Sequence, residues 1–198
     1  MSSDGLDRAL GLAGAVGGLV WAGIPVVGAL AFYGVEAGAV GLSSLGPPGA
    51  LFQFAGLSVV GMLAGTVGLY RRFPATAERW GRRGAVIAGA GFVLLLPGSL
   101  FPSGRLPSDV AQLVPLVFFA GLLAVAIGSL GAGLAARRSG AWPAGLAAGF
   151  GLAMPVGAAV GGLLAQSGGG NLAFVLGLVV PYGIAWIALG GAIAARRV

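Results

Sequence analysis

Two carboxylates and two carboxamides are the residues of this chain best placed to bind a ligand or move a proton. They are Glu36, Gln53, Asp109 and Gln112. Paired carboxylates can act as general acid and base, and a Gln amide can both donate and accept hydrogen bonds. Glu36 and Asp109 fall in different segments without a partner base, so we expect a weak ligand-binding cluster and no catalytic residue. The simpler interpretation, which the sequence favours, is that all four are hydrated interfacial residues.

A second group is basic. Five arginines and one glutamate lie between positions 71 and 83; the arginines are Arg71, Arg72, Arg79, Arg82 and Arg83. Such a cluster can contact anionic lipid headgroups or a partner protein. Arginines that only fix the orientation of a membrane protein would give the same pattern, and this simpler interpretation is favoured. Nucleic-acid binding would require a platform of stacked aromatic residues or a folded binding module, and the sequence indicates neither, so no nucleic-acid partner is expected.

Missing residue types exclude much chemistry. The chain has no His, no Cys and no Lys, and all eleven basic residues are Arg. Without Cys there is no disulfide, no thiolate nucleophile and no Cys-bound metal. Without His the commonest general base and metal ligand is absent, and without Lys no Schiff base can form. We therefore expect no enzyme activity, no metal and no cofactor.

The composition predicts an all-α integral membrane protein. Of 198 residues, 58% are hydrophobic and 8% are charged, and the mean hydropathy is +1.00. A bilayer span takes about 20 apolar residues. Six stretches of this kind predict one domain, 1–198, built as a six-helix transmembrane bundle; they are roughly 9–33, 49–70, 84–101, 112–136, 142–165 and 172–195.

The arginines predict the orientation of this bundle. Ten of the eleven fall at the N-terminus, the second and fourth connections and the C-terminus, whereas the other side has Arg105 alone. Positively charged loops stay in the cytoplasm. Both termini are therefore expected to be cytoplasmic in a multi-pass protein of the cell membrane, with membrane lipids as its surroundings.

Small and aromatic residues predict how the helices pack. Glycine contributes 40 residues, and pairs spaced four apart let transmembrane helices approach closely. We expect internal packing at these pairs, with a homodimer face as the alternative. Trp80 and Trp142 fall near span ends and predict an interfacial belt, whereas Trp21 and Trp186 are expected in the core. The glycine pairs are Gly14 with Gly18, Gly61 with Gly65, Gly145 with Gly149, and Gly157 with Gly161.

One region resembles a known family. Leu42-Ser43-Ser44-Leu45-Gly46, then Leu51-Phe52-Gln53, and later Leu100-Phe101-Pro102 with Phe118-Phe119, are similar to a family of six-helix prokaryotic membrane proteins, frequent in haloarchaea and actinobacteria. It is known only as domain of unknown function 998. The resemblance covers about residues 42–125 and implies a six-span bundle without an established reaction. The family often has a His between positions 107 and 112, which this chain lacks.

Two functions agree with these features. The first is a non-enzymatic bundle that binds a lipid or another apolar molecule, or serves as a subunit of a membrane complex, with a homo-oligomer or a second membrane subunit as its protein partner. The alternative is the substrate-binding component of a vitamin-type importer. Such components dock on an energising partner through small residues of the first helix, for which Ala9, Ala13, Gly14 and Gly18 are candidates. A lipid-active enzyme that uses Glu36 and Asp109 is the least favoured.

Overall fold

The structure is a computed structural model that describes residues 3–36, 48–73, 79–100 and 108–195. Helices account for nearly all of this part of the chain, which confirms the predicted all-α class. Six α-helices follow one another in the predicted order: α1 Ser3–Glu36, α2 Pro48–Arg72, α3 Arg79–Leu100, α4 Ser108–Ser139, α5 Ala144–Leu164 and α6 Gly170–Ala194.

Four segments in the described part of the chain are long and apolar enough to cross a membrane. They are Asp4–Val27 in α1, Gln112–Ser139 in α4, Ala144–Gly168 in and just after α5, and Ala173–Ala194 in α6. The described part of α3 begins with three arginines in its first five residues, and α2 ends in Arg71 and Arg72. Charged residues are costly in hydrocarbon, so the apolar part of α2 ends before Arg71 and that of α3 begins after Arg83.

Two glycines with positive φ turn the chain between antiparallel helices. Gly140, with φ of 65°, follows α4; the Ala141 amide donates to the Ala136 carbonyl at 3.1 Å and the Gly140 amide to Arg137 at 3.4 Å. This is the Schellman pattern that ends many helices. Gly168, with φ of 110°, lies at a kink in the short segment Ala165–Gly169, between α5 and α6. Only glycine adopts such angles without strain, so these two predicted turns lie at glycines of the sequence.

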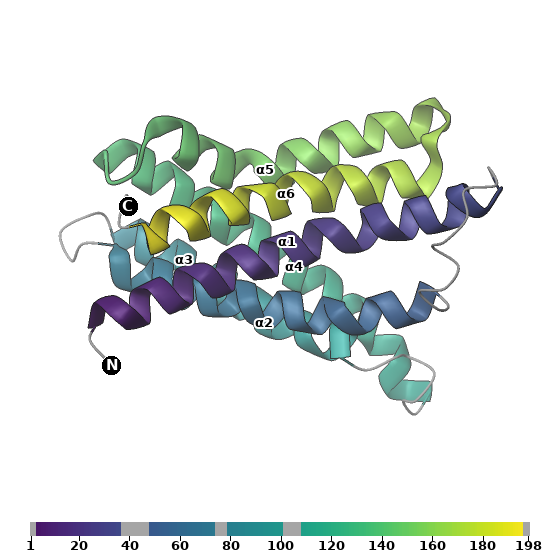
Figure 1. The fold of residues 1–198 in the computed structure, drawn as a ribbon, viewed down its shortest axis with the longest axis horizontal. Coiled ribbons are helices and arrows are strands. Elements are labelled where there is room, and N and C mark those ends of the chain that lie inside the picture. Colours follow the sequence, from purple (N-terminus) through teal and green to yellow (C-terminus); the bar gives the residue numbers. More distant parts are fainter. Residues whose placement is uncertain (1–2, 37–47, 74–78, 101–107, 196–198) are drawn as a thin grey trace.

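The helices form a closed ring. Each helix contacts the one before and the one after it in sequence, and α6 returns to contact α1. Figure 1 shows the helices side by side along the long axis of the molecule, with the N and C marks at the same end. Since antiparallel neighbours alternate in direction, the start of α1, the end of α2, the start of α3 and the end of α4 lie at that end.

Side chains of α6 fill the centre of the ring. Trp186 is fully buried, and its ring stands edge-on to Phe92 of α3 at 5.9 Å and to Phe150 of α5 at 5.3 Å between centroids. A β-carbon at Gly65 of α2 would lie 2.6 Å from the Trp186 ring, and one at Gly14 of α1 would lie 3.2 Å from it. The missing side chains of α1 and α2 thus make room for this indole, which is the structural reason for those two glycines.

Two helix pairs pack backbone against backbone through glycines seven residues apart. In α1 and α6, a β-carbon at Gly11 would lie 2.7 Å from the Gly190 carbonyl oxygen, and one at Gly18 would lie 2.6 Å from that of Gly183. In α3 and α4, a β-carbon at Gly91 would lie 2.7 Å from the Gly121 carbonyl oxygen, and one at Gly121 would lie 2.9 Å from that of Gly91. Gly84 and Gly128 approach each other's carbonyl oxygens in the same way. Such contacts bring Cα–H groups onto carbonyl oxygens, a weak but recurrent attraction.

The two helix pairs have the same seven-residue spacing of interface glycines but turn opposite faces to the interior. In α1 and α6 a buried residue directly precedes an interface glycine, as Gly17 and Tyr182 do, whereas in α3 and α4 a buried residue directly follows one, as Phe92 and Ser129 do. An inverted repeat of two three-helix halves would place equivalent faces inward. The shared glycine spacing therefore reflects the same kind of packing in two helix pairs and does not indicate such a repeat.

Three of the four predicted glycine pairs pack inside the bundle. Gly14 and Gly18 meet Gly65 and Gly183, Gly61 meets Ala13 and Gly17, and Gly157 and Gly161 meet Gly177. The prediction is wrong for Gly145 and Gly149, whose added β-carbons would meet nothing within 4 Å. Both residues are exposed, so this pair belongs to the outer surface of α5.

The tryptophans follow the prediction except at one position. Trp21 and Trp186 are buried as expected, and Trp80 is 65% exposed. Trp142 is wrong as an interfacial residue: it is buried, with its ring 5.3 Å from Phe73 and 6.0 Å from Phe150. The tight turn at Gly140 directs it inward, where it closes one end of the aromatic core.

Candidate functional site

The arginine-rich end is the first candidate. We use this name for the end of the bundle that carries Arg8, Arg71, Arg72, Arg79, Arg82, Arg83, Arg137 and Arg138, at the start of α1, the end of α2, the start of α3 and the end of α4. In the described part of the chain the acidic residues at this end are Asp4 and Asp7. The charge balance is therefore strongly positive, as the sequence predicts.

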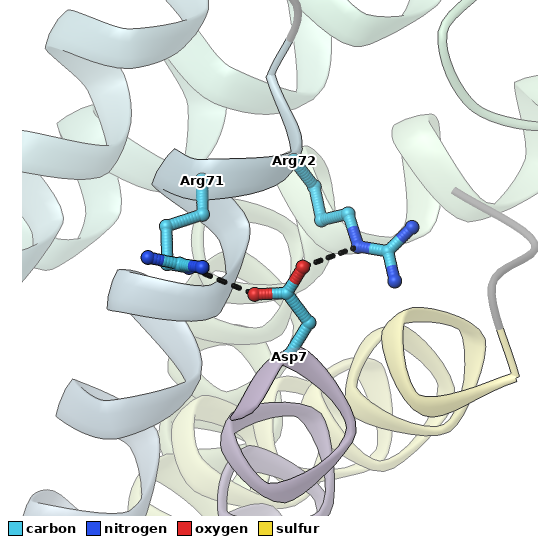
Figure 2. Close-up of polar contacts among 3 residues, drawn as sticks. All are labelled: Asp7, Arg71 and Arg72. Carbon is cyan, nitrogen blue, oxygen red and sulfur yellow. Dashed lines mark hydrogen bonds and ion pairs between the residues drawn. The ribbon is translucent and has the colours of Figure 1, made fainter. Parts of the chain in front are cut away.

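Asp7 ties α1 to the end of α2. Its carboxylate accepts a hydrogen bond from Arg71 Nε at 2.8 Å and lies 3.5 Å from Arg72 Nε. Figure 2 shows the aspartate pointing between the two arginines. Arg72 Nε is buried and has no hydrogen bond of good geometry, so its contact with Asp7 is an ion pair at longer range. The two arginines therefore hold the bundle together and are only partly available to a ligand.

Arg82 and Arg83 also make contacts within the protein. Arg82 donates to the Phe73 carbonyl from Nη2 at 3.1 Å and from Nε at 3.3 Å. Its guanidinium also lies 5.3 Å from the centre of the Tyr70 ring. Arg83 lies 5.3 Å from the centre of the exposed Trp80 ring. The Arg82–Tyr70 contact braces the end of α2 against the start of α3, whereas the Arg83–Trp80 contact lies within α3. Among the five predicted arginines, Arg79 and Arg83 are exposed and have no ion pair within the described residues.

The described residues do not bring the predicted polar cluster together at the end of the bundle opposite the arginine-rich end. Asp109 and Gln112 are exposed in the first turns of α4. Glu36 ends α1 and Gln53 lies in the second turn of α2, but their side chains lie outside the described part. The cluster therefore stays a prediction.

Buried hydroxyls inside the bundle are already satisfied. Ser129 of α4 and Tyr182 of α6 share a 2.7 Å hydrogen bond across the ring. Ser58 and Thr66 bond to carbonyls one turn earlier in α2, at 2.7 and 2.8 Å. Such bonds are expected where no water can reach. The Ser129–Tyr182 pair was not predicted, because nothing in the sequence shows which faces of α4 and α6 meet.

An apolar groove runs along the outside of α5 and α6. Its volume is about 390 Å³, and it is lined by Ala148, Gly149, Leu152, Ala153, Val156, Gly157, Val160, Gly177 and Pro181. Every lining side chain is aliphatic or absent. Leu152, Val156 and Val160 are 43%, 52% and 47% exposed, so the groove opens outward. We call it the α5–α6 groove.

Glycines and a proline form the floor of this groove. Pro181 lacks an N–H, so the Gly177 carbonyl one turn earlier loses its usual helical donor. Gly157 approaches that carbonyl so closely that an added β-carbon would clash with it, and one at Gly177 would lie 2.7 Å from the Gly157 carbonyl oxygen. Here α5 and α6 are in backbone contact, which leaves a hollow between their larger side chains. The sequence signal was present in Gly157, Gly177 and Pro181, but it does not show which side is hollow.

A smaller cleft lies on the other side of α5. It has a volume of about 20 Å³ and is lined by Leu130, Gly133, Leu134 and Arg137 of α4 together with Ala147, Ala148, Gly151 and Leu152 of α5. Ala148 and Leu152 border both hollows. We call it the α4–α5 cleft; its lining includes Arg137, one member of the arginine-rich end.

The described residues contain no group of three or more His, Cys, Asp or Glu side chains that could hold a metal ion. No protein-family model, curated protein or solved structure matches the chain. The resemblance to the six-helix family of unknown function therefore stays a prediction that rests on its short motifs.

Proposed function

We propose that this protein is a multi-pass membrane protein that binds an apolar molecule in the α5–α6 groove. The groove carries this proposal. Its volume of about 390 Å³ is in the range of small-molecule sites, about 300–1,000 Å³. Its lining lacks a charged or hydrogen-bonding side chain, so it suits a hydrocarbon chain and offers no group for catalysis.

The position of the groove supports an occupant from the bilayer. Both of its walls belong to segments that can cross a membrane, Ala144–Gly168 and Ala173–Ala194. An apolar hollow at that depth is poorly hydrated, because water would find no hydrogen-bonding partner there. A flexible chain that fills it gains dispersion contacts with the lining residues.

The same proposal includes six spans with both termini in the cytoplasm of the cell. It is supported by the six helices, by their alternating directions and by the arginine-rich end, which gathers the starts of α1 and α3 with the ends of α2 and α4. Positively charged segments remain on the cytoplasmic side.

The importer alternative is not favoured by the packing of α1. Two of the small residues expected to dock on an energising partner, Gly14 and Gly18, are buried against Gly65 and Gly183. Their backbone is already used inside the bundle, so the first helix does not present that face to another subunit.

Photolabelling with a neutral long-chain alcohol that bears a diazirine tests the groove. We expect saturable adducts at Leu152, Val156 and Val160, competed by the unlabelled alcohol. Labelling of Leu116 and Leu123 of α4, which are more exposed than the groove residues, should rise linearly with the probe concentration, as for a bulk lipid-facing surface. Saturable labelling confined to α4, or none at α5, would contradict the proposal.

Gly149→Leu should remove the saturable labelling. The added side chain meets no neighbour within 4 Å of its β-carbon, so the bundle is undisturbed while the groove is filled. Gly191→Leu is the matched control, because Gly191 of α6 is also exposed and open but does not line the groove. Unchanged labelling of Gly149→Leu would exclude the groove as the site.

A further inference from the structure

Arg137 stands where the apolar surface of α5 meets the arginine-rich end. It lies in the last turn of α4 and lines the α4–α5 cleft, across from Ala147 and Ala148 at the start of α5. Ala148 and Leu152 line both this cleft and the α5–α6 groove, so they form the ridge of α5 between the two. A single ligand that lies across this ridge of α5 can therefore contact both a guanidinium and a hydrocarbon-lined hollow.

The charge of Arg137 is not neutralised inside the protein. The side chain is exposed, and no ion pair to it occurs within the described residues. Asp7, which could compensate positive charge at this end, already contacts Arg71 and Arg72. An anion beside Arg137 is thus favoured both by the local guanidinium and by the field of the whole arginine-rich end.

We propose that the ridge of α5 binds an anionic phospholipid, with an acyl chain in the α5–α6 groove and the phosphate at Arg137. The inference rests on the proposed function of the groove and names the class of its ligand. A guanidinium binds phosphate through paired charge-assisted hydrogen bonds. The apolar lining requires that the same molecule carry a long hydrocarbon chain.

A second copy of the chain is a poorer occupant of this surface. Two copies in one membrane share the same orientation, so a symmetric contact through α5 would bring the two Arg137–Arg138 pairs toward each other. Like charges at such an interface are unfavourable. An anionic lipid removes this repulsion, whereas a second copy adds to it.

The test compares two photoactivatable phospholipids that differ only in the headgroup. Phosphatidylglycerol and phosphatidylcholine, each with the same diazirine-bearing acyl chain, are titrated against the full-length protein in neutral detergent. The readout is the adduct yield at Leu152 and Val156. One arginine near an anionic headgroup contributes about 1 kcal/mol, so phosphatidylglycerol should reach half-saturation at a roughly fivefold lower concentration.

Three variants separate the possible causes. Arg137→Gln should abolish the preference for phosphatidylglycerol but leave saturable labelling by phosphatidylcholine. Arg79→Gln removes the same charge from an exposed arginine of α3 and should keep the preference. Gly149→Leu should lower the labelling by both lipids.

The outcomes distinguish this inference from the proposed function. Equal half-saturation for the two lipids, or equal loss of preference in Arg137→Gln and Arg79→Gln, would overturn the selection of an anionic headgroup at Arg137 while leaving the groove intact. Labelling that does not saturate for either lipid and is unaffected by Gly149→Leu would overturn both. A second copy as the occupant would show as a dimer cross-linked through α5 whose yield phosphatidylglycerol does not lower, and this result would overturn the inference.

Discussion

At the residue scale, the side chains with the most obvious chemistry serve mainly to hold helices together. Arg71 and Arg72 share Asp7, Arg82 binds a backbone carbonyl, and the buried Tyr182 is paired with Ser129. In a membrane, an unpaired polar group costs free energy, so such residues are expected to find partners within the protein. Exposed groups such as Arg137 therefore remain for the lipid binding that we propose.

The Asp7 contact predicts a measurable coupling between α1 and α2. Asp7→Asn should lower the stability of the bundle in detergent, because the positive charges of Arg71 and Arg72 lose their counter-ion. Arg71 is 39% exposed on its side chain, so solvent screens the pair and we expect a coupling of only about 0.5–1 kcal/mol.

A double-mutant cycle of Asp7→Asn with Arg71→Gln, followed by thermal unfolding, measures this coupling. The same cycle with Arg79→Gln in place of Arg71→Gln is the control, because Arg79 is exposed and has no ion pair within the described residues. Additive effects of Asp7→Asn and Arg71→Gln would show that the contact contributes nothing to stability.

At the element scale, glycine decides which helices touch. The pairs α1–α6 and α3–α4 approach so closely that their interface glycines face carbonyl oxygens and amide nitrogens of the partner backbone. Backbone atoms cannot move aside as a flexible side chain can. A larger residue at these positions therefore separates two helices, whereas the same change on an open surface costs little.

Gly84→Leu should destabilise the protein strongly. An added β-carbon there would lie 2.5 Å from the Ala132 amide nitrogen and 2.7 Å from the Gly128 carbonyl oxygen. Overpacking typically lowers the free energy of unfolding by about 1–3 kcal/mol, and by more where the backbone must shift. We expect a lower unfolding temperature and a reduced yield of monodisperse protein.

Gly145→Leu is the matched control for this change. Its β-carbon meets nothing within 4 Å, and it exposes the same added side chain to lipid or detergent. Size-exclusion profiles and unfolding temperatures of both variants provide the comparison. Equal stability of Gly84→Leu and the parent protein would contradict the close packing of α3 on α4.

At the scale of the whole molecule, alternation of helix direction separates the charges. The arginine-rich end lies at one end of the bundle, whereas Asp109 and Gln112 lie in the first turns of α4 at the other. If the bundle crosses the membrane as proposed, these two groups are on opposite sides of the bilayer.

Single-cysteine labelling tests this arrangement directly, since the chain contains no Cys to interfere. A membrane-impermeant maleimide applied to intact cells should label Gln112→Cys but label Ser139→Cys only after the membrane is opened. Both residues are exposed. Labelling of Ser139→Cys from outside would reverse the proposed orientation, and equal labelling of both sites would contradict it.

The sequence alone determined the secondary structure, its order and the distribution of charge. Long apolar runs can satisfy their backbone only as helices, and glycine at positions 140 and 168 marks two of the turns. It also indicated that Gly14, Gly61 and Gly157 pack inside the bundle, which the contacts confirm. These features depend on residues close together in the chain.

Only the tertiary structure decided which faces meet. When nearly every position is apolar, a helix has no clear polar face to orient it, so the sequence could not show that Gly145 and Gly149 face outward or that Trp142 faces inward. The α5–α6 groove, its link to Arg137 and the Asp7 contact each join residues from different helices. They arise from the rotation and close approach of whole helices, which the backbone contacts between glycines establish.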